Sequence, residues 1–157
     1  MNNYNFPFGQ PLTKVEQKDT SKKKAFVLGV YASAVHAKWI DKDGKQKVSA
    51  LAVASEPDIF WTGENAEQMI SEIEIPAGLG KLTVPTDKKL NGPSGRALDK
   101  FFLSPLGLDR KSTWLCDLLP YSRVNEQQRK AIDTHYSNDI VEQYKLPPAT
   151  VPNFDKA

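Results

Sequence analysis

An almost uninterrupted apolar run, Thr113–Leu119, limits the folds that this chain of 157 residues can adopt. Such a run is typical of a strand that is covered on both faces, as strands in parallel sheets are. A second apolar run, Ala25–Val30, is rich in β-branched and aromatic residues and predicts another central strand. The long segment between the two runs predicts a crossover connection, so we expect the two strands to be parallel.

Further periodic segments predict a β-hairpin and helices. Val35–Ile40 and Lys47–Ala54 alternate apolar and polar residues around the Asp-Lys-Asp-Gly turn at residues 41–44, which predicts a hairpin. Asn65–Ile73 has apolar residues at helical spacing. We therefore predict an α/β fold of three layers, with a mainly parallel central sheet, helices on both faces and an added β-hairpin.

The later part of the chain contains clear signals for helix starts and ends. The turn at residues 91–95 places Pro93 at the first position of a helix, where a missing N–H has no cost. Gly107 is a stop signal, because a left-handed residue commonly ends a helix. Asn125 is expected to cap a further helix.

Length and composition predict one soluble globular domain, with 39% hydrophobic and 25% charged residues. We expect an extended N-terminal arm at residues 1–24, a single α/β domain at residues 25–146 and a Pro-rich tail at residues 147–157. No signal peptide or membrane-length apolar run is recognised, so the expected location is cytoplasmic and no membrane contact is expected. The single cysteine excludes an internal disulfide and a cysteine-rich zinc site, and we expect no cofactor and no metal.

The charge pattern leaves the question of a nucleic-acid partner open. A net charge of +2 is too small to indicate such a partner by itself. The run Lys22-Lys23-Lys24 has two interpretations: a contact for phosphates, or a solvated flank in front of a strand.

Polar residues gather where the predicted strands end, which is where open α/β sheets bind their ligands. Asp117 interrupts the second apolar run near its end, and an unpaired carboxylate is costly to bury, so we expect it to face a cleft. The loops that follow the two strands should meet at the same cleft, next to the glycine-rich helix start. The expected ligand-binding residues are Tyr31, Ser33, Ser94, Gly95, Arg96, Asp117, Tyr121, Ser122 and Arg123.

Two features, the helix start at residues 91–96 and the aromatic pair at residues 60–61, have competing interpretations. The helix start with Arg96 is either an anion site or a plain capped helix whose arginine faces solvent. Phe60 and Trp61 either stack on a base or cover the core.

A longer pattern joins these features. It reads Gly-Pro-Ser-Gly-Arg-x-Leu-Asp at residues 92–99, Gly-Leu-Asp-Arg at residues 107–110, and then the apolar strand at residues 114–120. This pattern resembles the uracil-DNA glycosylase superfamily, and the resemblance covers about residues 25–125. It implies the family's α/β fold in a shortened or divergent form with an incomplete sheet, a cleft for a nucleobase or nucleotide, and DNA or a nucleotide as the partner. Any enzymatic activity it implies is that of a DNA-glycosylase-type hydrolase.

The chain departs from the pattern of that family at three places. The loop Gly29–Ser33 has no Asp, Asn or Glu, one of which positions water in the family. Asp117 stands where many members have an Asn that reads the base, and His135 lacks the flanking Pro-Ser of the family's His motif. An ionised Asp117 accepts hydrogen bonds and repels an anionic leaving base, so it favours an amino-bearing base over uracil.

The expected function is therefore binding of a nucleobase-type ligand with weak or absent catalysis. The alternative is a non-catalytic structural module, because a truncated sheet would expose an edge and an apolar face and so form a homo-oligomer.

Overall fold

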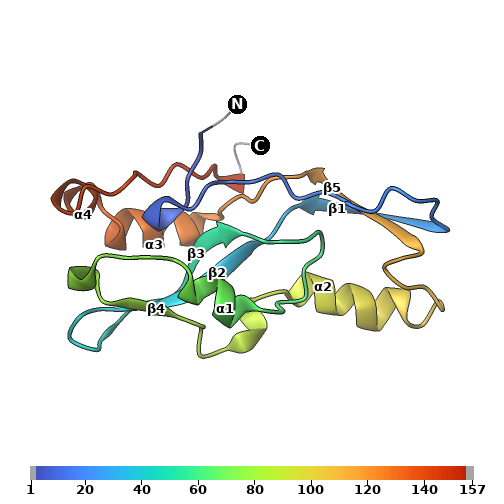
Figure 1. Ribbon diagram of the computed structural model, residues 1–157, viewed down its shortest axis with the longest axis horizontal. Coiled ribbons are helices and arrows are strands. Elements are labelled where there is room, and N and C mark those ends of the chain that lie inside the picture. The colour runs from blue at the N-terminus through green and yellow to red at the C-terminus, as the bar shows by residue number, and fades with distance from the viewer. Residues whose placement is uncertain (1–2, 155–157) are drawn as a thin grey trace.

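Two sheets form the framework of the chain in a computed structural model that describes residues 3–154 (Figure 1). Strands β1 (Ala25–Tyr31) and β5 (Thr113–Leu119) form a two-stranded parallel sheet, with Ala25 opposite Thr113. After β1, the chain turns at residues 32–33 into a second sheet, which consists of β2 (Ala34–Ile40), β3 (Gln46–Ser55) and β4 (Lys81–Thr83). This sheet is antiparallel, with the strand order β3-β2-β4.

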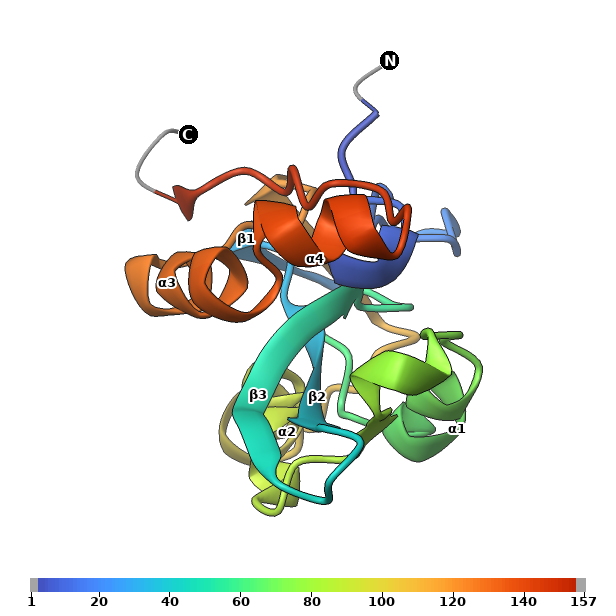
Figure 2. The same cartoon turned by 90° about the vertical axis from the view of Figure 1, so that its left-hand side faces the viewer.

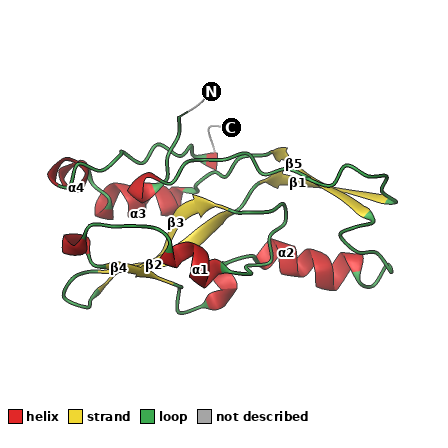
Figure 3. Cartoon of the chain, viewed as in Figure 1, coloured by secondary structure: helices red, strands yellow, loops and turns green. Residues whose placement is uncertain are grey.

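The α-helices are α1 (Ala66–Ser71), α2 (Pro93–Ala97), α3 (Glu126–His135) and α4 (Asn138–Gln143). Helices α3 and α4 lie above the antiparallel sheet, and α2 lies below the parallel sheet (Figures 1 and 3). Helix α2 continues directly into the π-helical segment η4 (Leu98–Leu103). Three 3-10 turns are η1 (Pro7–Gly9), η2 (Ala77–Leu79) and η3 (Lys88–Leu90).

Most of the predicted elements are confirmed. Both central strands form and are parallel, and β2 and β3 form the predicted hairpin. Gly44 at its turn has φ +83°, a left-handed angle that glycine adopts without strain. Helix α2 begins at Pro93, and the Asn125 side chain caps α3 by accepting a hydrogen bond from the Gln128 N–H at 2.8 Å. The helix that starts at Pro93 ends at Leu103, earlier than the predicted stop at Gly107, and Gly107 lies in the following turn with φ +67°.

The predicted three-layer, mainly parallel sheet is wrong. Only β1 and β5 are parallel, and the three other strands form a separate antiparallel sheet. The expectation that both faces of β5 are covered is also wrong, because Leu118 is 69% exposed. An apolar strand sequence shows that burial is favourable, but it does not supply a second layer of helices.

The larger core lies between the antiparallel sheet, helices α1, α3 and α4, and both ends of the chain (Figure 2). Trp39 of β2 is fully buried at its centre, and its indole N–H donates to the carbonyl of Leu79 at 2.7 Å. Phe8 from the N-terminal arm packs edge-on against Trp39 and against Tyr136 of α3, each at a centroid distance of 5.1 Å. Val151 of the Pro-rich tail is also fully buried there. The arm and the tail therefore belong to the packed body.

The smaller core lies between the inner face of the parallel sheet and the α2–η4 helix. Its buried members include Leu98, Leu103 and Leu115. The outer face of β1 is uncovered: Phe26 is 63% and Leu28 is 56% exposed. Among residues 3–154, the parallel sheet is thus packed on its inner face, and its outer face is exposed at these positions.

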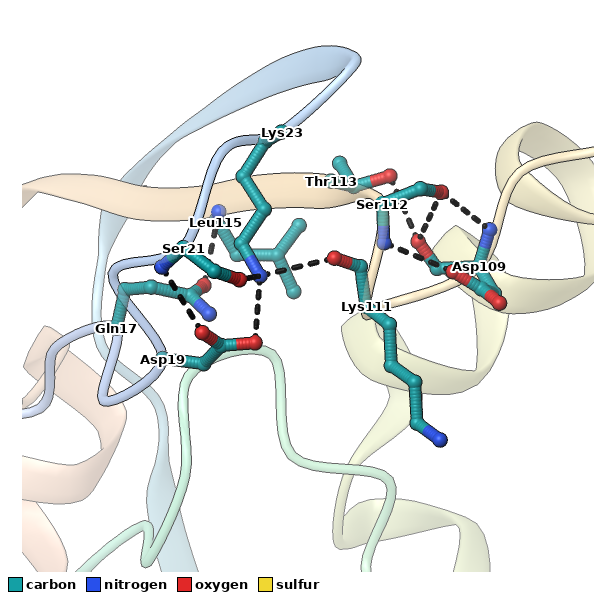
Figure 4. Close-up of polar contacts among 9 residues, drawn as sticks. All are labelled: Gln17, Asp19, Ser21, Lys23, Asp109, Lys111, Ser112, Thr113 and Leu115. Atoms are coloured by element: carbon teal, nitrogen blue, oxygen red, sulfur yellow. Dashed lines mark hydrogen bonds and ion pairs between the residues drawn. The ribbon is translucent and has the colours of Figure 1, made fainter.

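A polar network fixes the N-terminal arm beside the start of β5 (Figure 4). The Lys23 side chain is only 5% exposed, and its ammonium donates to Asp19 at 2.7 Å and to the carbonyl of Lys111 at 2.8 Å. The Lys23 hydrogen bond is the main cause that lowers the pKa of Asp19 well below its usual range. Within the lysine run, Lys23 therefore serves the fold, and Lys22 and Lys24 are exposed.

No helix among residues 3–154 combines the length and apolarity needed to span a membrane.

Candidate functional site

The ends of β1, β3 and β5 and the start of α2 enclose a cavity of about 330 Å³, which we call the strand-end cavity. Its lining residues are Gly29, Val30, Tyr31, Ser33, Glu56, Phe60, Ser94 and Asp117. Three strand ends and a glycine-rich helix start therefore meet at one place. A larger cavity of about 640 Å³ lies beside α1, and none of the nine predicted ligand-binding residues lines it.

The structure brings four of the predicted residues together in the strand-end cavity: Tyr31, Ser33, Ser94 and Asp117. The other five are not among its lining residues: Gly95, Arg96, Tyr121, Ser122 and Arg123. Whether any of the nine binds a ligand stays a prediction.

Arg96 is engaged with the backbone. Its guanidinium donates to the carbonyls of Thr62 at 2.9 Å and of Lys89 at 2.8 Å, and also to the carbonyl of Asn91. Three carbonyl acceptors from two loops hold this side chain at the base of α2. The guanidinium therefore acts as a clamp between loops and does not simply face solvent, and the anion site stays a prediction.

The loop that follows β5 likewise supports the fold around the cavity. Ser122 is fully buried, and its hydroxyl donates to the Ser33 carbonyl at 2.5 Å. Arg123 donates to the carbonyl of Asn153 at 3.5 Å, and Tyr121 is 41% exposed. Ser122 thus positions Ser33, which lines the cavity, from behind.

Gly29 makes room for the Asp117 carboxylate. The two residues are paired across the parallel strands. A Cβ atom at Gly29 would lie 2.1 Å from Asp117 Oδ1 and 2.9 Å from Cζ of Phe60. The absence of a side chain at residue 29 therefore allows the carboxylate and the aromatic ring to approach each other over the strand.

Glu56 is a second carboxyl group in the cavity and was missed by the sequence analysis. It directly follows β3 and is 4% exposed. Its Oε1 accepts from the Ser33 N–H at 3.2 Å, and its own N–H donates to the Ser33 carbonyl at 3.3 Å. The signal that could have identified it is an acidic residue two positions beyond the predicted hairpin strand Lys47–Ala54.

Burial changes the protonation of both carboxyl groups. Burial, with a smaller contribution from the charge of Asp117, raises the pKa of Glu56 to about 7, although N–H groups of Ser33 and Trp61 oppose the shift. Burial also raises the pKa of Asp117. A carboxyl group with a pKa near 7 can accept or donate a proton at neutral pH, which is the requirement for general acid–base chemistry.

Arg110 holds the Phe60 loop against α2. Its guanidinium donates to the carbonyls of Phe60 at 2.6 Å and Gly95 at 3.3 Å, and its Nε donates to Asp99 at 2.9 Å. The aromatic ring on this loop lines the cavity, whereas the neighbouring Trp61 is 4% exposed and belongs to the larger core. The two aromatic residues therefore have different roles.

Comparison with known proteins gives no match: no protein-family model, no curated protein and no solved structure is significantly similar to this chain. The relationship to the uracil-DNA glycosylase superfamily stays a prediction that rests on the residues named above.

Proposed function

We propose that this chain is a uracil-DNA-glycosylase-like protein that binds a nucleobase or nucleotide-type ligand in the strand-end cavity. One observation carries the proposal: a carboxylate, hydroxyl groups and the ring of Phe60 face a single cavity of about 330 Å³. That volume is at the lower end of the usual range of small-molecule sites, roughly 300 to 1,000 Å³, and suits a planar heterocycle. Phe60 offers a face or edge for stacking, and Asp117 offers acceptors for base N–H groups.

The charge of the lining favours an amino-bearing base. Within residues 3–154, the cavity lining contains the carboxyl groups of Glu56 and Asp117 and no Lys, Arg or His. An ionised carboxylate accepts hydrogen bonds from an exocyclic amino group and repels an anion. We therefore expect cytosine, adenine or guanine groups to bind more tightly than uracil, and free phosphates to bind elsewhere or not at all.

The same lining limits catalysis. Glu56 is suited to accept a proton from water at neutral pH. A departing base also needs stabilisation of its negative charge, and each of the two carboxyl groups opposes that charge when it is ionised. We therefore expect ligand binding to be the main activity and any hydrolysis of the glycosidic bond to be slow.

Isothermal titration calorimetry with cytidine, adenosine, guanosine and uridine tests this function. The expected result is binding of at least one amino-bearing nucleoside, with uridine weaker by about ten-fold or more, which corresponds to the loss of one good hydrogen bond. Titration with single-stranded and mismatched DNA at two salt concentrations shows whether the sugar-phosphate backbone adds affinity. Absence of binding by all four nucleosides and by DNA would contradict the proposal.

Replacing Asp117 with asparagine should change the preference of the cavity. An amide both donates and accepts hydrogen bonds, so uridine should gain relative to the amino-bearing nucleosides by about ten-fold or more. The measurement is the ratio of dissociation constants in the Asp117→Asn variant and in the unmodified protein. Asp43→Asn, at the exposed hairpin turn, is the control and should leave the ratio unchanged. An unchanged ratio in Asp117→Asn would remove Asp117 from base recognition.

Replacing Gly29 with alanine should close the cavity without unfolding the chain. The new methyl group would meet the ends of two side chains, Asp117 and Phe60, and both can rotate away from it. We expect at least about a ten-fold loss of nucleoside affinity, because the displaced groups occupy the space of the ligand. Circular dichroism checks that the fold persists, and unaltered affinity would show that the ligand binds elsewhere.

A further inference from the structure

The outer edges of β3 and β4 are both protected from pairing with another strand. On β3, the side chain of Gln128 accepts from the Ala52 N–H at 2.9 Å and donates to the Ala50 carbonyl at 2.8 Å, so it takes the place of a neighbouring strand. On β4, the edge is only three residues long and begins with Lys81. Short length and an edge lysine are common means by which proteins prevent the pairing of an edge with another chain.

The N-terminal arm protects β5, and β1 is left open. The Leu115 N–H donates to Oε1 of Gln17 at 3.1 Å, and the Val15 N–H donates to the Pro120 carbonyl at 2.8 Å. β1 pairs with β5 on one side and has no strand partner on its other side among residues 3–154. Among the four sheet edges that residues 3–154 form, the outer edge of β1 is the one that no other described residue protects.

The sequence of β1 also lacks the features that discourage pairing. Its seven residues, Ala-Phe-Val-Leu-Gly-Val-Tyr, include no charged residue and no proline, and its register with β5 contains no bulge. The outward-facing side chains are apolar and exposed: Phe26 is 63%, Leu28 is 56% and Val30 is 57% exposed. A two-stranded sheet is marginally stable alone, and packing against the α2–η4 helix stabilises this one on its inner face.

We propose that the outer edge of β1 pairs with β1 of a second copy of this chain, antiparallel about a two-fold axis at Leu28. Phe26 then lies opposite Val30 of the second copy, and the two Leu28 side chains face each other. In this register, each outward-facing residue of one copy lies opposite an outward-facing residue of the other copy. The apolar outer faces of the two copies therefore lie on the same side of the joined sheet. The product is a four-stranded sheet in the order β5-β1-β1-β5.

A second copy is the occupant that the properties of the edge favour. An uncharged, apolar strand has no charge for a charged partner to match, and it is complementary to itself in an isologous interface. Contact along one seven-residue strand buries less than a standard interface of roughly 1,600 Å², so a dissociation constant of about micromolar size is expected.

Cysteine cross-linking tests the register. Directly opposed residues of antiparallel strands have Cα atoms roughly 4.5 to 5.5 Å apart, within the range of a disulfide. Leu28→Cys, made in a Cys116→Ser background, should therefore form a cross-linked dimer on mild oxidation at micromolar concentration. Phe101→Cys in the same background is the control, because Phe101 is 64% exposed but lies on η4, and it should cross-link far less. Equal cross-linking of the two variants would overturn the proposal.

Sedimentation velocity of the unmodified chain gives an independent test. A monomer–dimer equilibrium is expected, and Leu28→Lys should weaken it by about ten-fold or more, because two like charges would then face each other. Phe101→Lys should leave it unchanged. A strict monomer at all accessible concentrations would overturn the proposal.

Discussion

Replacing Glu56 with glutamine should raise the free energy of unfolding by about 3 kcal/mol at pH 8 and leave it nearly unchanged at pH 4. Glu56 is 4% exposed, and its pKa rises from 4.5 to about 7 on folding, mainly because of burial. The folded state therefore holds the proton more tightly than the unfolded state does. Glutamine keeps the carbonyl oxygen that accepts from the Ser33 N–H and cannot ionise.

The direction of this change in the free energy of unfolding follows from proton linkage. Between pH 4.5 and about 7, the folded chain binds more protons at Glu56 than the unfolded chain, so the contribution of Glu56 to the free energy of unfolding falls as pH rises through this window. Urea denaturation at both pH values measures the difference. Glu67→Gln, an exposed site on α1, is the control and should have little effect at either pH. A gain of equal size at both pH values would show that Glu56 does not titrate as described.

The second large effect is expected at Gly95, where alanine should destabilise the protein by about 3 kcal/mol or more. A Cβ atom there would lie 2.2 Å from the carbonyl oxygen of Phe60 and 2.3 Å from that of Trp61. Both obstacles are backbone atoms, so α2 must move away from the loop and stretch the bonds that Arg110 donates to the Phe60 and Gly95 carbonyls. Ser94 and the Phe60 ring would separate, so nucleoside affinity should fall as well.

Chemical denaturation of Gly95→Ala measures this cost, and Gly44→Ala is the matched control. Gly44 has φ +83° with no atom near its missing Cβ, so alanine there should cost only about 1 to 2 kcal/mol of backbone strain. Equal losses of stability in the two variants would show that the close approach of the Phe60 and Trp61 carbonyls to Gly95 does not make alanine costly there.

Sequence patterns predicted local structure well because the signals for it are local. The apolar run of β5, the Asp-Gly turn of the hairpin and Pro93 at the start of α2 each specify their element within a few residues. The residues that cover the faces of a strand come from distant parts of the sequence. The sequence of β5 is the same whether one or two faces are packed, so the exposure of Leu118 could not be predicted.

The candidate site likewise contains one contact that the sequence indicated and others that arise only in the folded chain. The meeting of Tyr31 and Asp117 follows from parallel pairing, which the sequence indicated. The clamp formed by Arg96 depends on three carbonyls from loops at residues 62 and 89–91, which no spacing rule brings together. Glu56 enters the cavity because the end of β3 lies beside Ser33, and this contact exists only in the folded chain.

The most direct test of the central claim is a ¹H–¹⁵N NMR titration of the chain with cytidine, adenosine and guanosine. If a nucleobase binds between Phe60 and Asp117, the amide signals of Gly29, Tyr31, Ser33 and Asp117 should shift in proportion to occupancy, and those of α4 should not. Shifts confined to other parts of the chain, or no shift with any of the three nucleosides, would contradict the assignment of the strand-end cavity as a nucleobase site.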